Sequence, residues 1–170
     1  MTSSLTGRRA LVTGGSRGIG AEIVRRLASD GAAVAFTYGS SAAEAEKLVA
    51  EVAESGGTAV AIQADSADPE QVARSVDDAA AELGGLDILV NNAGVAHVDA
   101  VESFPLEQFD RLVAVNVRAV FVATQRALRH IGEGGRIINI GSINADQVPG
   151  PGLAVYAMTK AAVALSLIHI

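Results

Sequence analysis

The feature that most constrains the fold is a regular alternation of short apolar runs with longer amphipathic segments. The runs are rich in Val, Ile and Leu and do not alternate in polarity, which is typical of parallel strands covered on both faces. The repeated strand–helix unit predicts an α/β fold with a doubly wound parallel sheet and right-handed crossovers. The five runs are Ala10–Thr13, Val34–Tyr38, Thr58–Ala64, Leu86–Asn91 and Arg136–Ile140.

The segments between the runs carry signals for helix ends. Ser41 and Glu44 have the spacing of a capping box, and Asp68 places a cap before a proline at position 69. Longer helices are expected over Leu106–Leu128 and Ala154–Ala164. Glycines mark the points where a helix ends and a strand follows. They are Gly31, Gly56-Gly57, Gly84-Gly85 and Gly134-Gly135.

Composition excludes several classes of protein. With 170 residues the chain fits one domain, and its formal charge of −6 argues against binding to nucleic acid or to an anionic membrane. It has no cysteine, and His97, His130 and His169 share no metal-ligand spacing, so no metal site is expected. Neither a signal peptide nor an apolar run of about 20 residues is evident, which favours a cytoplasmic location.

A glycine-rich turn follows the first predicted strand and opens a helix. Gly14, Gly18 and Gly20 remove the side chains that would keep a pyrophosphate from the backbone N–H groups at the helix N-terminus. A purely structural turn is the alternative, although the strand-to-helix context is the one that such a motif requires. The spacing Gly-x-x-x-Gly-x-Gly differs from the commoner Gly-x-Gly-x-x-Gly and indicates a narrower family.

Five motifs together resemble the short-chain dehydrogenase/reductase family, and within it the 3-oxoacyl reductases. They are Thr13–Gly20, Asn91-Asn-Ala-Gly94, Asn116, Ser142 and Tyr156-x-x-x-Lys160, which extend the likeness from Ala10 to about Ala164. The resemblance implies a Rossmann-type fold, a nicotinamide cofactor, and a small-molecule carbonyl or alcohol substrate. It also implies a homodimer or homotetramer.

The end of the second strand selects the cofactor in such folds. An acidic residue there binds the ribose 2′-hydroxyl of NAD, but this chain has Tyr38. Arg17, in the glycine turn, offers a cation for a 2′-phosphate, and Ser40 offers a hydroxyl. Unless Arg17 is only a solvated loop residue, the pattern favours NADP(H) over NAD(H).

Further cofactor contacts follow from the resemblance. It implies that Asp65 holds the adenine amino group, with a helix-capping role as the alternative, and that the motif ending in Gly94 packs against the cofactor and also holds the sheet. The complete set predicted to bind the cofactor is Gly14, Ser16, Arg17, Gly18, Ile19, Gly20, Tyr38, Ser40, Asp65, Ser66, Asn92, Ala93, Gly94, Tyr156 and Lys160.

Tyr156 and Lys160 are candidate catalytic residues. Their spacing of four in a predicted helix puts both side chains on one face. An ammonium group beside a phenol favours the phenolate, which brings proton transfer closer to neutral pH. The resemblance implies that Tyr156 donates the proton, Lys160 binds the nicotinamide ribose and tunes the phenol, and Ser142 polarises the carbonyl. It further implies that Asn116 holds a water, with a helical asparagine bonded to backbone groups as the alternative.

The chain departs from the family after its catalytic helix. The family adds further strands and a substrate loop, so we expect a domain over 1–164 that has about five strands and lacks the C-terminal ones. The end, Leu165–Ile170, resembles one reading frame of a transposase end sequence used in DNA-library adapters and is expected to be a non-native tail. A genuine fragment and an engineered truncation are the alternatives.

Three functions stay open at this point. An NADP(H)-dependent reductase of a 3-oxoacyl compound or another ketone is favoured, and the loop Val148–Gly152 is expected to shape the substrate mouth. A nucleotide-binding regulator without turnover is the second, but such proteins typically lose the catalytic residues that this chain keeps. An inactive, poorly soluble fragment is the third, because missing strands would expose sheet edge and core.

Overall fold

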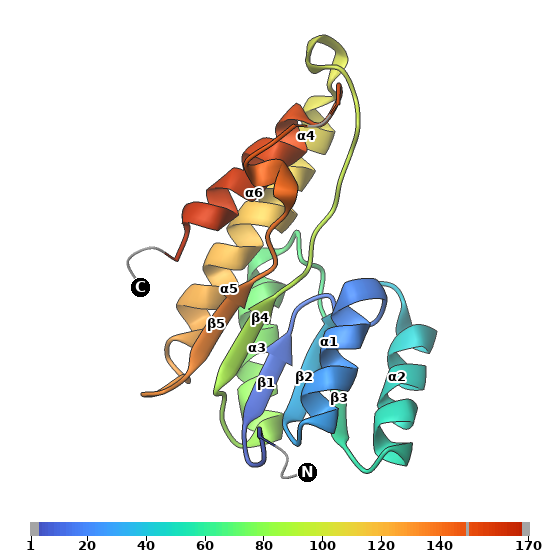
Figure 1. The fold of residues 1–170 in the computed structure, drawn as a ribbon, viewed down its shortest axis with the longest axis vertical. Coiled ribbons are helices and arrows are strands. Elements are labelled where there is room, and N and C mark those ends of the chain that lie inside the picture. Colours follow the sequence, from blue (N-terminus) through green and yellow to red (C-terminus); the bar gives the residue numbers. More distant parts are fainter. Residues whose placement is uncertain (1–3, 149, 168–170) are drawn as a thin grey trace.

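The fold was examined in a computed structural model, which describes residues 4–148 and 150–167. The described strands form one five-stranded parallel sheet in the order β3-β2-β1-β4-β5, which confirms the predicted fold class (Figure 1). Each strand begins and ends within two residues of the apolar run that predicted it. The strands are β1 (Arg9–Val12), β2 (Ala33–Tyr38), β3 (Thr58–Gln63), β4 (Ile88–Asn91) and β5 (Arg136–Asn139).

Helices fill the connections between the strands. The first three are α1 (Gly18–Ser29), α2 (Ala42–Glu54) and α3 (Pro69–Leu83), followed by α4 (Leu106–Val113), α5 (Ala119–Ala127) and α6 (Ala154–Leu165). Short 3-10 turns, η1 (Val101–Ser103) and η3 (Ile143–Ala145), lie in the loops. The helix predicted over Leu106–Leu128 is therefore two α-helices, joined by a π-helical turn, η2 (Ala114–Arg118).

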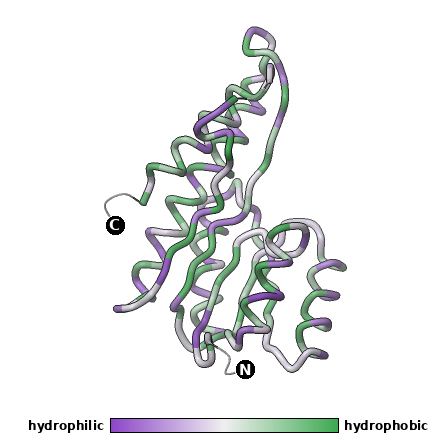
Figure 2. Tube along the Cα trace, in the orientation of Figure 1, coloured by the Kyte–Doolittle hydropathy of each residue, from purple (hydrophilic) through white to green (hydrophobic). Residues whose placement is uncertain are grey.

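Each face of the sheet has its own apolar core. Val12, Val34 and Phe36 pack with residues of α1 and α2, whereas Leu11 and Leu89 pack with residues of α3 and α5. These two pairs of helices cover opposite faces of the sheet (Figure 1). Successive side chains of a strand alternate between faces, so every central strand must be apolar on both. Figure 2 shows the result, with hydrophobic residues along the central strands and mixed polarity along α2.

The strand order reverses beside β1, and this reversal places the functional crevice. β2 and β3 lie on one side of β1, and β4 and β5 on the other, so the loops that leave β1 and β4 part at the carboxyl edge of the sheet. Ligands of open α/β sheets bind in the crevice at such a switch point. The loop after β4 rises along this edge toward α4 (Figure 1).

One of the two predicted helix caps is confirmed and the other is wrong. Asp68 accepts hydrogen bonds from the backbone N–H groups of Glu70 (2.8 Å) and Gln71 (3.2 Å) at the start of α3. Ser41 precedes α2 as expected, but its side chain makes no capping hydrogen bond. The backbone of Ser41, with φ −90° and ψ 61°, is not in the extended conformation typical of an N-cap, and Ser41 lines a cavity instead.

A hydrogen bond joins the C-terminal part of the described chain to β5. This strand lies at the outer edge of the described sheet, and Ile138 is 45% exposed. Ser166, just after α6, accepts a hydrogen bond from Asn139 Nδ2 (2.8 Å). The end of the expected tail, 168–170, lies outside the described residues, as does residue 149 of the expected substrate loop.

Within residues 4–148 and 150–167, no helix is long and apolar enough to cross a membrane. In the same part of the chain, no group of His, Cys, Asp or Glu side chains could hold a metal ion.

Candidate active site

The glycine turn between β1 and α1 is shaped by backbone conformations that favour glycine. Gly14 has φ +64° and Gly18 has φ +54°, both in the left-handed region that side chains with a Cβ rarely adopt. The turn is fixed to β2, because Gly14 N donates to Thr37 Oγ1 (2.9 Å) and Gly15 N donates to the Thr37 carbonyl (2.8 Å). The turn is thus held open at the N-terminus of α1.

The glycines of this turn serve two different needs. A Cβ on Gly18 would meet no atom within 4 Å, so this position borders open space that a ligand's phosphates could approach. A Cβ on Gly20 would instead collide with the Gly14 carbonyl and lie 2.5 Å from Asn92 Nδ2. Gly20 is therefore required for packing of the turn, and Gly18 for access to it.

Gly20→Ala is expected to destabilise the fold by about 1–3 kcal/mol, because the backbone that it meets cannot move aside without shifting the turn. Cofactor affinity should fall with it. Thermal unfolding with and without NADPH measures both effects. Gly132→Ala is the matched control, since a Cβ there meets nothing within 4 Å. An unchanged melting temperature for Gly20→Ala would contradict the packing role.

Asn92 fastens the end of β4 to the end of β1. Its Nδ2 donates to the carbonyls of Thr13 and Gly14, both at 2.9 Å. Thr13 Oγ1 accepts in return from the backbone N–H groups of Asn92 and Ala93, both at 3.0 Å. The motif that ends in Gly94 thus holds together the ends of β1 and β4, the two strands that flank the crevice.

A cavity of about 490 Å³ lies above this turn. Its lining includes every residue predicted to bind the cofactor, except the two that also belong to the catalytic group. Those lining residues are Gly14, Ser16, Arg17, Gly18, Ile19, Gly20, Tyr38, Ser40, Asp65, Ser66, Asn92, Ala93 and Gly94.

Arg17 provides an unpaired cation at the cavity. It stands at the N-cap position of α1, and its exposed guanidinium makes no ion pair or hydrogen bond with any described residue. The first turn of α1 contains no acidic residue that would compete with a bound anion for the backbone N–H groups of the helix N-terminus. Tyr38 and Ser40 line the same cavity from the loop after β2. An anion could therefore meet Arg17, the helix terminus and the Ser40 hydroxyl together.

Asp65 is not the cap of a helix. The cap of α3 is Asp68, whereas one carboxylate oxygen of Asp65 accepts from the Ala67 N–H (2.9 Å) and shapes the loop after β3. Its backbone N–H donates to Gln71 Oε1 (3.0 Å). The exposed carboxylate keeps its other oxygen free to accept a hydrogen bond inside the cavity.

The sequence missed other residues of the lining, chiefly Val95, Arg111 and Val115. Arg111 and Val115 are four apart at the junction of α4 and the π-helical turn, so they lie on one side of the helix. This spacing was the only sequence signal that could have identified the two residues. It indicates a cavity lining only once α4 is known to lie over the crevice. Arg111 is exposed and, like Arg17, pairs with no described residue.

The candidate catalytic pair, Tyr156 and Lys160, lies on one helix, α6, as expected. Lys160 Nζ is 5.9 Å from the centroid of the Tyr156 ring. Lys160 is only 6% exposed, and burial lowers the pKa of its ammonium group below the usual value. Its Nζ donates to the Ile140 carbonyl (2.8 Å), which anchors the lysine at the end of β5. The Tyr156 hydroxyl has no partner among the described residues.

Lys160 of the candidate catalytic pair lies next to the cavity at Gly94. A Cβ on that glycine would lie 3.8 Å from Lys160 Nζ and 3.5 Å from Asn116 Oδ1. Asn116 sits in the π-helical turn, where Oδ1 accepts from Val95 N (2.9 Å) and Nδ2 donates to the Val95 carbonyl (2.9 Å) and Thr159 Oγ1 (3.0 Å). Its side chain thus bonds backbone groups and holds the loop after β4 against α6, while the role of holding a water stays a prediction.

Ser142 lies just after β5 and starts the 3-10 turn η3. Its Oγ accepts from the Asn144 N–H (3.2 Å), and the side chain is half-buried. η3 packs against α6, which carries Tyr156. No hydrogen bond joins the side chains of Ser142 and Tyr156 within the part of the chain that the structure describes.

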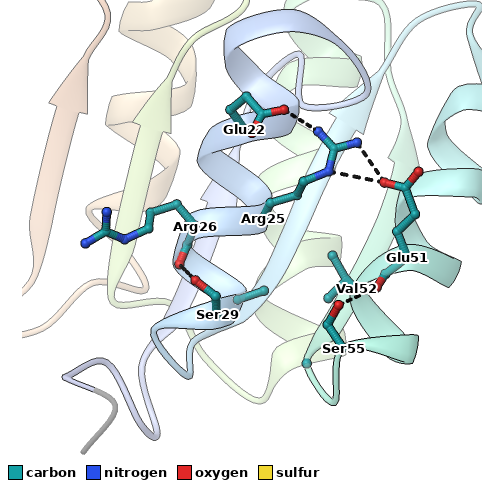
Figure 3. A pocket seen from close by; sticks show the side chains of 9 residues that line it. Glu22, Arg25, Arg26, Ser29, Glu51, Val52 and Ser55 are labelled. Carbon is teal, nitrogen blue, oxygen red and sulfur yellow. Dashed lines mark hydrogen bonds and ion pairs between the residues drawn. The ribbon is translucent and has the colours of Figure 1, made fainter. Parts of the chain in front are cut away.

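A larger hollow of about 610 Å³ lies between α1 and α2. Figure 3 shows Arg25 at its rim, where Nη1 donates to Glu22 (2.6 Å) and Nη2 to Glu51 (2.7 Å). The guanidinium of Arg25 is thus already paired with the two carboxylates. The described lining of this hollow contains neither the tyrosine–lysine pair nor a glycine turn. The candidate site is therefore the smaller cavity, which Lys160 approaches at Gly94.

Comparison with known proteins gives a consistent result. Residues 8–167 match the family model described as short chain dehydrogenase. A short-chain dehydrogenase/reductase from Serratia marcescens is 57% identical with a TM-score of 0.92, covering 94% of this chain and 65% of its own. A short-chain dehydrogenase from Burkholderia cenocepacia, solved in complex with NADP, is 55% identical with the same TM-score and the same coverage of 94% and 65%.

A curated relative, an uncharacterized oxidoreductase from Methylorubrum extorquens, is 48% identical over 94% of this chain and 64% of its own length. The chain thus spans slightly less than two thirds of the relatives that it matches.

Proposed function

The chain belongs to the short-chain dehydrogenase family, and we propose that the whole protein is an NADP(H)-dependent oxidoreductase that interconverts a carbonyl compound and a secondary alcohol. The observation that carries the proposal is the meeting of two sets of residues at Gly94. On one side is the cavity of the glycine turn, and on the other is buried Lys160, whose Nζ lies 3.8 Å from the position of a Gly94 Cβ. A dinucleotide along the cavity would end beside the catalytic pair.

The residues of the cavity fit NADP(H). Gly18 leaves open space where a pyrophosphate can approach the N-terminus of α1. Arg17 is unpaired, and Tyr38 replaces the carboxylate that would repel a 2′-phosphate. The NADP complex of the Burkholderia relative, which is 55% identical, supports the same choice.

The chain's own residues then have distinct roles. When bound, the nicotinamide supplies a hydride to the carbonyl carbon or takes one from the alcohol. Tyr156 donates the proton to the carbonyl oxygen, because its hydroxyl has no other partner among the described residues. Lys160 places a positive charge 5.9 Å from the phenol ring, which stabilises the phenolate left behind. Ser142 hydrogen-bonds the carbonyl oxygen and polarises it, while Asn116 holds Val95 beside α6.

The first test of this proposal is cofactor choice. We expect NADPH to bind the purified protein more tightly than NADH and to give the higher kcat/KM in ketone reduction by the whole protein. Titration followed by the fluorescence of the reduced nicotinamide measures the binding. A clear preference for NADH would contradict the roles given to Arg17 and Tyr38.

Arg111→Gln is expected to weaken NADPH and NADH alike, by roughly 2- to 10-fold. Arg111 lines the cavity from α4, whereas the candidate 2′-phosphate ligands Arg17 and Ser40 come from the N-terminus of α1 and the loop after β2. Its loss should therefore not discriminate between the two cofactors. Arg129→Gln is the matched control, because Arg129 is also exposed and unpaired among the described residues but lies after α5, away from the cavity. Unchanged affinity for both cofactors in Arg111→Gln would remove Arg111 from the site.

The domain extent of 1–164, the homodimer or homotetramer, and the cytoplasmic location stay predictions. A size measurement of the whole protein tests the oligomeric state.

A further inference from the structure

A third cavity, much smaller than the two described above, adjoins the candidate cofactor cavity, and we call it the inner cavity. Its open space is about 10 Å³, which is room for one water molecule. Four residues line both the inner cavity and the cofactor cavity. They are Ala64, Ser66, Ala93 and Val115. The remaining lining comes from the ends of β1, β2 and β4 and from the helices α3 and α5.

Polar side chains gather at the inner cavity, although the core around it is apolar. Thr13, Thr37 and Asn91 each lie two positions after an apolar core residue that packs with α3 and α5, so all three lie on that face of the sheet. Ser75 of α3 also lines this cavity and is only 2% exposed. Buried polar side chains are nearly always hydrogen-bonded. Four of them around one small space indicate a polar occupant.

One buried atom of this lining, Oδ1 of Asn91, has no hydrogen-bond partner in the part of the chain that the structure describes. Both hydrogens of the same amide are used, because Nδ2 donates to Thr124 Oγ1 (3.2 Å) and to Asn139 Oδ1 (2.9 Å). Neither Thr124 nor Asn139 lines the inner cavity, whereas Asn91 does, so Oδ1 is the amide atom that faces it. An unpaired buried acceptor is destabilising. The described residues themselves bury this atom, so a partner for it has to fit inside the cavity.

The hydroxyl groups of the lining can complete the hydrogen bonds of a water at this place. Ser75 Oγ donates to the Val72 carbonyl (2.8 Å) and keeps lone pairs that can accept. Thr37 Oγ1 accepts from Gly14 N (2.9 Å), while its own hydrogen has no acceptor among the described residues. Buried waters typically make about three hydrogen bonds, and Asn91 Oδ1, Ser75 Oγ and the Thr37 hydroxyl supply that number.

We propose that the inner cavity binds one ordered water molecule, which donates to Asn91 Oδ1 and Ser75 Oγ and accepts from the Thr37 hydroxyl. This water ties α3 to the ends of β2 and β4 beside the cofactor cavity. Because the water holds its hydrogen, the Thr37 hydroxyl keeps a lone pair directed at Gly14 N, and the water thereby steadies the glycine turn. The inference goes beyond the proposed function, since the water would be bound whether or not the protein reduces a carbonyl compound.

A crystal structure of the whole protein, solved with and without NADPH at a resolution that defines ordered waters, tests the proposal directly. We expect density for one water within about 2.5–3.0 Å of Asn91 Oδ1 in both structures. Density that defines the surrounding side chains but no water, or an amide whose Oδ1 bonds another protein atom, would overturn the inference. Neither outcome depends on activity, so this test stays separate from that of the proposed function.

Ser75→Ala tests the water in solution. The variant removes one partner of the water, so we expect the melting temperature of the whole protein to fall by roughly 2–4 °C, although alanine is the better helix former. Ser29→Ala is the matched control, because Ser29 Oγ also donates to a carbonyl three residues earlier, that of Arg26 (2.8 Å), but is exposed and lies outside the inner cavity. It should cause no such loss. A melting temperature of Ser75→Ala equal to or above that of the wild type would contradict the inference.

NADPH binding tests the link between the water and the glycine turn. Ser75 does not line the cofactor cavity, so a weaker affinity in Ser75→Ala reaches the cofactor through the water. We expect the dissociation constant of this variant to rise by about 2- to 5-fold, and that of Ser29→Ala to stay unchanged. Equal affinities of the two variants for NADPH would refute the steadying of the turn by the water.

Discussion

Tyr156→Phe is expected to lower kcat for ketone reduction by roughly 10²- to 10⁴-fold, the usual contribution of a general acid. The ring keeps its half-buried packing on α6, and the hydroxyl that is lost has no partner among the described residues. NADPH affinity and the melting temperature should therefore stay close to those of the wild type. Steady-state kinetics of the whole protein, together with a binding titration, measure the difference.

Lys160→Ala provides the contrast for this variant. Its Nζ is buried, bonds the Ile140 carbonyl and lies beside Gly94, so its removal should lower cofactor affinity and stability as well as kcat. Substantial activity in Tyr156→Phe would mean that another group supplies the proton. A Lys160→Ala variant that binds NADPH normally would place the lysine outside the cofactor site.

Arg17→Ala is expected to weaken NADPH by about 1.5–3 kcal/mol, or roughly 10- to 150-fold, through the loss of one charge-assisted hydrogen bond. NADH should be affected much less, because it lacks the 2′-phosphate. The ratio of the two dissociation constants is the readout, and it is insensitive to a general loss of fold. Equal weakening of both cofactors would assign Arg17 to the pyrophosphate and contradict its role as selector.

Comparing Arg17→Ala with Arg111→Gln shows which part of the cavity binds the 2′-phosphate and which binds the groups that both cofactors share. Arg17 stands at the N-terminus of α1 and Arg111 on α4, so the two cations approach the cavity from different elements. Selective loss at Arg17 with common loss at Arg111 would place the 2′-phosphate near α1. The double variant should then show the selective and the common effects added, as separate sites do.

Features that depend on local sequence were predicted well. Apolar runs such as Val34–Tyr38 form the strands, since a strand buried on both faces has to be apolar at every position. The glycine turn was also visible, because Gly14 and Gly18 adopt conformations that other residues avoid. In a parallel sheet the loops after β3 and β4 leave the same edge, so Asp65 and Gly94 line one cavity as a consequence of the strand order alone.

Features that depend on tertiary contacts were missed. The π-helical turn Ala114–Arg118 interrupts an apolar periodicity that predicted one continuous helix. Its residue Asn116 bonds Val95 and Thr159, which are distant in sequence, and such contacts can stabilise a helix that is locally unfavourable. Arg111 was missed for the same reason, since only the packing of α4 brings it to the cavity.

The central claim is that the whole protein reduces a carbonyl group with hydride from NADPH, and isotope transfer tests it most directly. The protein is incubated with ethyl 3-oxobutanoate and NADPH that carries deuterium at C4 of the nicotinamide, separately on each of the two faces. Mass spectrometry and NMR then locate the label in the product. We predict that one of the two labelled cofactors delivers deuterium to the carbinol carbon of ethyl 3-hydroxybutanoate, and that Tyr156→Phe slows the transfer by roughly 10²- to 10⁴-fold. Consumption of NADPH with no label in the product from either cofactor, or transfer that persists undiminished in Tyr156→Phe, would contradict the account.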